Sequence, residues 1–540
     1  MKRPAIRVLC VVFALASALA LAGGGGEKSA TTTTPSVPAA GNTLPIAKAG
    51  SVTLTLACLE GWYSAVSIND VLPIWQEFEK RTGVKIKFQA YSDYDTAMQP
   101  RIAAGTELPD IMVVPPSWSN RGVFRAALDG VIIDVGDLVT KYAPNIVKYF
   151  AKNPDVKALM TAPDGKLYAI AADVPKDVNG VVAFTLMYRR DWVQKLGMKE
   201  PTSVDEWYAL WKAFKNKDPN GNGKADEVPL SQGWGSIAYL SGAWGLPAPM
   251  PTYWPDANGK VQYLYTTQAY RELLTFASKL YAEDLLEKEM GRSEDEMNSM
   301  AGRNILGTYA TLCGYIPQLD LASQQGGAGQ ADWWGAMPPV KGGKLQLVKR
   351  DPVWNYYGIT KACKDPVVAT RWVDYVWGSD DGDLLLNAGF EGQQYTKNAD
   401  GTIEFLPWVT KNPDGLDVYN ALRSLGAHNT ILSRTTNPIY LALQKGKKSL
   451  QVEQLFISSR VEPFPNVMPT TAEEEVLNAI EPDLNTYMNE MRSKFITGSE
   501  PLSKFDDYVK QVEKLRLADL LKVKQAQYER YAKVMATVGK

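Results

Sequence analysis

The chain has 540 residues, 45% of them hydrophobic, and its 58 Lys and Arg nearly balance its 59 Asp and Glu. Domains average roughly 150 residues, so this length excludes a single small domain and predicts more than one hydrophobic core. A net charge of −1 provides no basic field for nucleic acid, which we exclude as an expected partner. The 15 Trp and 26 Tyr provide flat faces on which sugar rings stack, although we expect most of them to fill the cores.

The first 22 residues have the pattern of a signal peptide. Lys2 and Arg3 precede an apolar run over 6–22 that is marginal for spanning a bilayer and typical of an export signal. We therefore expect residues 1–22 to be a signal peptide and the chain to be exported to the periplasm or to the outer face of the cell membrane. A lipoprotein signal would have cysteine in place of Gly24, so the sequence leaves a lipid anchor open.

A low-complexity segment of Gly, Ser, Thr, Pro and Ala follows over 23–50 and predicts a flexible linker. No later run is long and apolar enough for a transmembrane helix. The three cysteines after the signal, Cys58, Cys313 and Cys363, are an odd number at wide spacing. They indicate neither a disulfide framework nor a metal cluster, and they allow at most one disulfide.

The folded region begins with alternating strands and helices. The hydrophobic pattern predicts strands over 52–57, 84–88 and 110–114, separated by helices over 71–82 and 94–104. The order strand, helix, strand, helix, strand is typical of a parallel sheet in an α/β protein. Ligands of such sheets bind at the carboxyl ends of the strands. The segments that follow these strands are therefore candidates for a binding site, and they carry Trp62, Tyr63, Ser92, Asp93, Ser117 and Trp118.

Several longer segments resemble the extracellular solute-binding proteins of family 1, which is the maltose-binding type. The first two read IWQEFEKRTGVKIKFQ and MQPRIAAGTELPDIMVV, and the similarity extends, in family order, over 74–89, 98–114, 164–174, 186–214 and 488–531. The last segment is similar to the tail of the longer branch that includes calcium-containing alginate-binding proteins. The resemblance covers nearly the whole chain after the linker.

This resemblance implies a periplasmic-binding-protein fold of two discontinuous α/β lobes joined by a hinge. The N-terminal lobe is expected over 50–170 plus 304–360, and the C-terminal lobe over 171–303 plus 361–540. The implied function is that of a monomeric extracytoplasmic receptor of an ABC importer. It would capture an oligosaccharide, either neutral or containing uronate, and deliver it to the transmembrane subunits of the permease.

A second motif, DPNGNGKADE over 218–227, resembles the first half of an EF-hand calcium loop. Oxygen-bearing side chains alternate, Gly223 occupies the sixth position, and Pro229 stands where an EF-hand has its bidentate Glu. Related importer receptors hold structural calcium in similar loops, so the resemblance implies calcium here. The expected ligands are Asp218, Asn220, Asn222, the carbonyl of Lys224, Asp226 and Glu227. The alternative is a polar turn without metal.

Candidate sugar ligands follow from position, because sugar recognition combines stacking aromatics with planar polar groups and has no fixed motif. They are Trp62, Tyr63, Ser92, Asp93, Trp118, Asp173, Lys176, Arg189, Trp234, Trp244, Trp354, Tyr356, Tyr357, Gln393 and Tyr395. For a uronate, Lys176 and Arg189 are the expected carboxylate clamps. Five tryptophans at helical spacing are expected in the core instead: Trp192, Trp207, Trp211, Trp372 and Trp377.

Two other classes of function stay open. The chain's one histidine, His428, has no nucleophile motif near it, so a histidine-based triad is not expected. A secreted carbohydrate-active enzyme would need two carboxylates about 5 to 10 Å apart, for which Asp173 and Glu391 could serve. A peptide receptor of the same design would have a cleft less rich in Trp than the cluster of Trp234, Trp244 and Trp254 suggests. We expect a binding protein and no enzyme.

Overall fold

The computed structural model describes residues 43–538 except 61–65, 174–183, 328, 330, 343, 429–430, 435 and 445–447. The predicted signal peptide and most of the linker, as well as Trp62, Tyr63 and Lys176, lie outside the described residues. Within the described ranges, no helix has the length and apolarity needed to cross a membrane. Cys58, Cys313 and Cys363 are unpaired, and the first two are buried.

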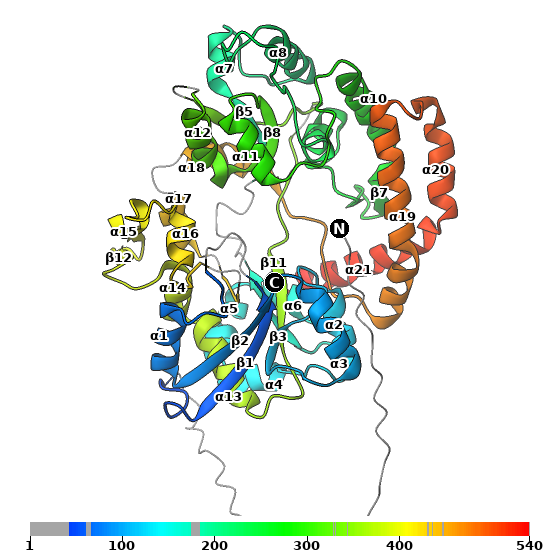
Figure 1. Ribbon diagram of the computed structural model, residues 1–540. Coiled ribbons are helices and arrows are strands. Elements are labelled where there is room, and N and C mark those ends of the chain that lie inside the picture. The colour runs from blue at the N-terminus through cyan, green and yellow to red at the C-terminus, as the bar shows by residue number, and fades with distance from the viewer. Residues whose placement is uncertain are drawn as a thin grey trace, which may run out of the picture. The chain divides into compact units, whose positions relative to one another are not determined.

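A five-stranded sheet forms the centre of the first core (Figure 1). Its strand order is β2 (Val84–Tyr91), β1 (Val52–Leu59), β3 (Ile111–Val113), β11 (Val353–Ile359) and β4 (Ala169–Asp173). The predicted parallel pairing is confirmed, since β1 pairs in parallel with both β2 and β3. Strand β11 returns from far along the chain and runs antiparallel to β3 and β4.

Helices surround this sheet and supply the rest of the first core. They begin with α1 (Pro73–Thr82), where Pro73 starts the helix and Gly83, at φ 72°, ends it in the left-handed conformation. The others are α2 (Tyr94–Ala104), α3 (Arg121–Leu128), α4 (Gly136–Tyr142), α5 (Pro144–Lys152), α6 (Pro154–Met160), α13 (Pro366–Val373), α14 (Asp380–Ala388), α15 (Pro407–Thr410), α16 (Val418–Arg423) and α17 (Asn437–Gln444). The small hairpin of β12 (Tyr395–Lys397) and β13 (Ile403–Phe405) packs with them.

The second core forms around a three-stranded antiparallel sheet of β8 (Thr308–Leu312), β5 (Phe184–Arg189) and β9 (Trp333–Ala336). Its helices are α7 (Arg190–Lys195), α8 (Val204–Asn216), α9 (Trp234–Ile237), α10 (Gln268–Ala282), α11 (Glu294–Gly302), α12 (Ile316–Gln325) and α18 (Lys448–Phe456). Two further strand pairs are β6 (Tyr253–Pro255) with β7 (Val261–Tyr263), and β10 (Leu347–Val348) with β14 (Arg460–Val461). All five tryptophans that were expected in the core are at most 1% exposed, which confirms that prediction.

Three C-terminal helices complete the second core: α19 (Thr471–Thr497), α20 (Phe505–Lys514) and α21 (Leu517–Val538). Figure 1 shows α19, in orange, beside α10. A capping box of Thr470 and Glu473 starts α19. Arg121 of α3 connects this helix to the first core, since its guanidinium lies 3.0 Å from Glu474 and 2.9 Å from Glu481.

The two cores divide the chain differently from the predicted lobe boundaries. The strand expected near 304–312 exists as β8, but it pairs with β5 of the second sheet, so 304–347 does not join the first core. Residues 361–443, expected in the C-terminal lobe, pack in the first core instead. An apolar run predicts a strand but does not indicate which sheet the strand joins. The sequence over 304–312 therefore predicts a strand correctly and assigns it to the wrong lobe. Only β11 makes the predicted return.

Candidate functional site

Polar and aromatic side chains gather at the edge of the first sheet where β3 ends and β11 begins. We call Trp118, Asn120, Arg350, Asp351, Trp354 and Asn355 the sheet-edge cluster. The backbone N–H of Trp118 donates to Oδ1 of Asn355 at 3.0 Å. Both residues have positive φ, 64° and 46°, a conformation that non-glycine residues seldom adopt. The register of β11 also shifts between Trp354 and Tyr356, and such bulges commonly lie beside binding sites.

Arg350 and Asp351 place opposite charges next to each other in this cluster. The guanidinium of Arg350 lies 5.2 Å from the centre of the Trp354 ring. Its side chain is exposed, yet burial lowers its pKa, an effect that Asp351 and Tyr315 oppose. Burial likewise raises the pKa of Asp351, while Asn466 and Arg350 lower it. A side chain on a concave surface can be open to water and still lose part of its solvation, because protein surrounds it on several sides.

Three buried polar atoms of this cluster make no hydrogen bond within the described part of the chain. They are Oδ1 of Asn120, Nδ2 of Asn355 and Nε1 of Trp354. Asn120 and Asn355 are each only 1% exposed. A buried polar atom without a partner costs about 1 to 3 kcal/mol, so such atoms indicate a place where a ligand or water completes the bonding.

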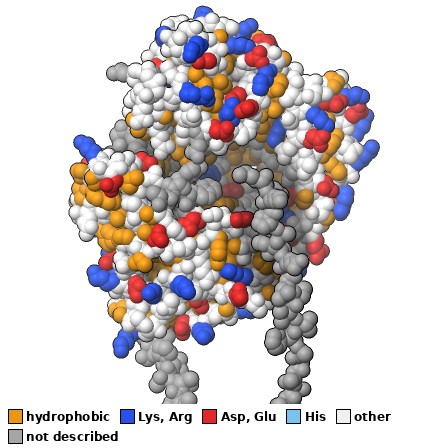
Figure 2. Space-filling view, in the orientation of Figure 1, with side chains coloured by type: hydrophobic (Ala, Val, Ile, Leu, Met, Phe, Trp, Pro, Cys, Tyr) orange, Lys and Arg blue, Asp and Glu red, His pale blue; other side chains and the backbone are white. Residues whose placement is uncertain are grey.

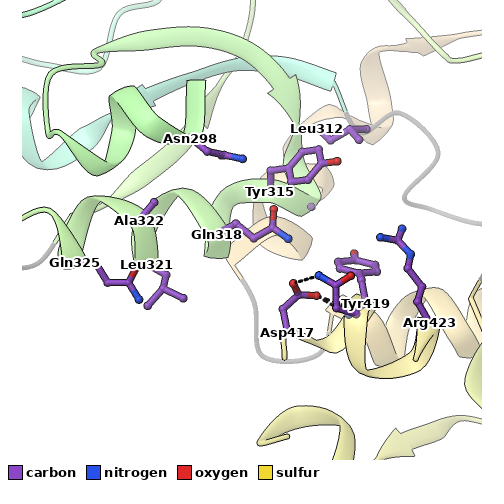
Figure 3. Close-up of a pocket in the computed structure, with 12 residues that line it drawn as sticks. Asn298, Leu312, Tyr315, Gln318, Leu321, Ala322, Gln325, Asp417, Tyr419 and Arg423 are labelled. Atoms are coloured by element: carbon purple, nitrogen blue, oxygen red, sulfur yellow. Dashed lines mark hydrogen bonds between the residues drawn. The ribbon is translucent and has the colours of Figure 1, made fainter. Parts of the chain in front are cut away.

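A second concave site lies between elements of the two cores (Figure 3). This pocket has a volume of about 540 Å³. The side chains of Tyr419 and Arg423 on α16 point toward the start of α12 (Figure 3). That segment carries Tyr315 and Gln318. The lining residues are Asn298, Leu312, Gly314, Tyr315, Gln318, Leu321, Ala322, Gln325, Asp417, Tyr419, Asn420 and Arg423.

Asp417 fixes the floor of this pocket, because its carboxylate caps α16. It accepts the backbone N–H groups of Tyr419 at 2.9 Å and Asn420 at 3.0 Å, and the side-chain amide of Asn420 at 2.8 Å. Oδ1 of Asn420 is buried without a hydrogen-bond partner in the described ranges. The Tyr419 ring lies 5.3 Å from that of His428. Aromatic faces beside fixed amide groups suit a ligand that combines C–H faces with hydroxyls.

The structure brings together only part of the predicted ligand set. Trp118, whose backbone donates to Asn355, and Trp354, the residue before Asn355, belong to the sheet-edge cluster, and the backbone of Asp173 pairs with Val353 at the same edge. Ser92 and Asp93, before α2, and Gln393 are exposed, each outside the cluster and the pocket as defined above. Tyr356, Tyr357 and Tyr395 are buried members of the first core, and half-buried Trp234 and Trp244 pack on the second.

Arg189 has a structural position that does not fit the predicted carboxylate clamp. It is 1% exposed, its Nε donates to Oδ1 of Asp191 at 2.8 Å, and its Nη1 donates to Asn304. Its guanidinium also lies 4.5 Å from the centre of the Trp192 ring. The donors are therefore used within the second core, and burial prevents contact with a sugar. The sequence alone shows an arginine at the end of a strand and cannot show that a nearby carboxylate engages it.

The residues that sequence reasoning missed come from distant segments. Arg350 and Asp351 precede a strand that was predicted, but its antiparallel direction, which brings them to the edge where β3 ends, was not. In the pocket, Tyr315 and Tyr419 are about a hundred residues apart in sequence and carry no motif. Sequence spacing contains no signal that these two segments meet.

The loop over 218–227 is folded around Asp218. Its carboxylate accepts the backbone N–H groups of Gly221, Asn222 and Gly223 at 2.9, 3.1 and 3.0 Å. The side-chain amides of Asn220 and Asn222 both donate to Oδ1 of Asp226 at 3.1 Å. The side-chain oxygens of Asn220 and Asn222 accept backbone N–H groups within the loop, at 3.0 Å from Asn222 and 2.8 Å from Lys224.

Glu227 provides the test of whether this loop suits a cation. Both of its carboxylate oxygens are buried without a normal hydrogen bond to the described residues. Burial raises its pKa, weaker contacts with the backbone N–H groups of Glu227 itself and Asn220 lower it, and the charges of Asp218 and Asp226 raise it further. Within the described residues, no group of three or more His, Cys, Asp or Glu side chains is arranged to hold a metal. The candidate ligands here are instead a mixture of carboxylate, amide and carbonyl oxygens, which is the set that calcium takes.

Comparison with known proteins identifies the family. Residues 70–382, more than half of the chain, match the model of the bacterial extracellular solute-binding protein family. The chain belongs to this family. The fructooligosaccharide ABC transporter substrate-binding protein FusA of Streptococcus pneumoniae is 28% identical over 489 residues, which cover 85% of this chain and 87% of FusA. The polygalacturonan/rhamnogalacturonan-binding protein YtcQ of Bacillus subtilis is 24% identical over 81% of this chain and 84% of YtcQ.

Solved structures of this family share the fold. FusA from S. pneumoniae in complex with kestose matches with a TM-score of 0.73 at 25% identity, over 89% of this chain and 99% of FusA. The alginate-binding protein AlgQ2, solved without calcium ion, also has a TM-score of 0.73, at 24% identity, over 88% of this chain and 98% of AlgQ2. The predicted two-lobed periplasmic-binding-protein fold is therefore confirmed.

Proposed function

We propose that this solute-binding protein captures an oligosaccharide outside the cytoplasm and delivers it to the transmembrane subunits of an ABC permease. The observation that carries the proposal is the pocket of Figure 3, where the rings of Tyr315 and Tyr419 stand beside the polar side chains of Gln318, Asn420 and Arg423. The relatives named above bind fructooligosaccharides and polygalacturonan, which supports a sugar ligand.

The protein acts as a monomeric receptor without turnover, and its signal peptide directs it outside the cytoplasm. Figure 2 supports a small polar ligand, because Lys and Arg alternate with Asp and Glu over the face shown and form no field of one sign. Such a surface does not attract polyanions. A carbohydrate-active enzyme would cleave the bound sugar, whereas a receptor would leave the sugar intact.

The test is tryptophan fluorescence with a panel of neutral and uronate-containing oligosaccharides, with chromatography of each mixture and a peptide library as the alternative ligand. We expect a saturable change with some sugar and unchanged ligand. Tyr419→Ala should weaken that binding about 10-fold or more, because one stacked ring contributes about 1 to 3 kcal/mol. Tyr281→Ala, at a half-buried position of α10 that does not line the pocket, is the matched control. Cleaved sugar, or binding of peptides alone, would refute the proposal.

We also propose that the loop over 218–227 binds one structural calcium ion. Its ligands would be the side chains of Asp218, Asn220, Asn222, Asp226 and Glu227 with the carbonyl of Lys224. The unpaired, buried carboxylate of Glu227 supports this assignment. So does a FusA structure described as an EF-hand mutant. Bound calcium would neutralise three clustered carboxylates and stabilise the loop on the second core.

A further inference from the structure

The sheet-edge cluster contains unused hydrogen-bonding groups of both kinds, and their balance bears on the chemistry of the ligand. On the donor side, the indole N–H of Trp354 and the amide of Asn355 are buried and unpaired within the described part of the chain. On the acceptor side, the amide oxygen of Asn120 is buried and unpaired there as well. A site with both kinds of group suits a partner that can donate and accept.

Arg350 and Asp351 extend the same balance to charge. The guanidinium lies beside Trp354 at 5.2 Å from the ring centre, and the next residue in the chain provides a carboxylate. Among the described residues, the carboxylate of Asp351 accepts one long hydrogen bond, 3.4 Å, from the amide of Asn466. The pair sums to zero charge, so a ligand carboxylate placed here would meet Asp351 as well as Arg350. Repulsion from a like charge at this range offsets the attraction of the guanidinium.

We propose that the sheet-edge cluster is a sugar subsite, and that it selects a neutral oligosaccharide over a uronate. Resting on the proposed function, this inference names the substrate class. Hydroxyls of a neutral sugar donate to Asp351 while accepting from Arg350, and a bound water can connect the sugar to the buried Oδ1 of Asn120 and amide of Asn355. The Trp354 ring provides a face for stacking. A uronate carboxylate only accepts, and it would leave the acceptors of the cluster unpaired.

Of the two cations expected to bind a uronate, Lys176 lies outside the described residues. Arg189 is buried and engaged by Asp191. In the pocket, Arg423 is accompanied by the carboxylate of Asp417, whose oxygens cap α16.

Calorimetric titration of the full chain with kestose, nystose and maltotriose as neutral probes, and with trigalacturonate and trimannuronate as acidic probes, tests the proposal. We expect the wild-type protein to bind a neutral probe at least 10-fold more tightly than either acidic one. Asp351→Asn should weaken that neutral binding about 10-fold and strengthen binding of an acidic trisaccharide, because it leaves the Arg350 charge uncompensated. Asp519→Asn removes a carboxylate from an exposed Arg–Asp pair on α21 and should change neither affinity.

The possible outcomes separate this inference from the proposed function. Equal or tighter binding of an acidic probe by the wild-type protein would overturn the neutral selectivity and leave sugar binding intact. Unchanged affinities in a folded Asp351→Asn protein would show that the cluster is no subsite. Failure of every sugar would refute the proposed function itself. Arg350→Gln, expected to weaken neutral binding about 10-fold, provides the same test should Asp351→Asn fail to fold.

Discussion

The loop over 218–227 and the sheet-edge cluster are both polar, but they differ in what they leave unpaired. In the loop, the groups without partners are the two oxygens of Glu227, and the nearby amides already donate to Asp226. In the cluster, unpaired donors and acceptors stand together. Acceptors alone suit a cation, whereas a mixture suits hydroxyls. The kind of unpaired group therefore indicates the class of ligand more directly than the number of charges does.

Removing Asp218 should give the largest effect. Asp218→Ala deletes a proposed calcium ligand and the acceptor for three backbone N–H groups. At calcium a thousand times above its Kd, the wild-type protein gains about 4 kcal/mol of unfolding free energy, and the variant should gain none. Urea denaturation in millimolar calcium and in EDTA measures both values.

Asp256→Ala is the matched control for this experiment, because Asp256 also accepts two backbone N–H groups in a tight turn, at 2.9 Å each, but lies outside the calcium loop. It should lower stability by about 1 kcal/mol in both buffers. If calcium leaves the stability of the wild-type protein unchanged, the loop is a polar turn. The unpaired acceptors of Glu227 would then not indicate a cation.

Two arginines sharpen the distinction between a residue used by the fold and one available to a ligand. Arg189→Gln should lower the unfolding free energy by about 3 to 5 kcal/mol, since it breaks a buried pair with Asp191. Arg350→Gln removes an exposed side chain and should cost less than about 1 kcal/mol of stability. Thermal unfolding and sugar titration of both variants measure the two effects. A large loss of stability in Arg350→Gln would show instead that the fold uses Arg350, as it uses Arg189.

Local patterns in the sequence predicted elements far better than they predicted assembly. The helix over 94–104 and the parallel strands β1 and β2 were predicted correctly, because hydrophobic periodicity depends on near neighbours alone. The calcium loop could be proposed for the same reason, since its candidate ligands lie within ten residues. Strand β8 was found, but its sheet was not, because the choice of partner depends on packing between distant segments.

The candidate sugar site shows the same limit. Trp118 was predicted from its position after a strand and Trp354 from its place on the returning strand, and both lie in the sheet-edge cluster. Tyr356 and Tyr357 were predicted on the same strand but are buried, because neighbouring residues of a strand that is covered on both faces all pack inside. The lining of the pocket could not be predicted, since α12 and α16 meet only in the folded chain.

Another carboxylate with an unpaired oxygen, Glu453 of α18, should give a smaller effect that depends on pH. It is 2% exposed, the hydroxyl of Tyr440 donates to one oxygen, and the other has no partner in the described ranges. Burial raises the pKa of Glu453 to about 7, while Tyr440 and Arg460 lower it. Here the unpaired oxygen suits a proton, in contrast to the cation proposed for Glu227.

The sign of the effect follows from proton binding. Between pH values of about 4.5 and about 7, folded Glu453 keeps a proton that the unfolded chain has lost. The unfolding free energy should therefore fall as pH rises through this window, by at most about 3 kcal/mol from this residue, and then level off. Glu453→Gln keeps a neutral side chain of the same shape and should remove this slope. Asp374 and Asp383, whose pKa values burial raises to about 6, contribute equally to both proteins. Urea denaturation across this range compares them, and parallel curves would mean that Glu453 is ionised in the folded protein and that its unpaired oxygen is satisfied by solvent.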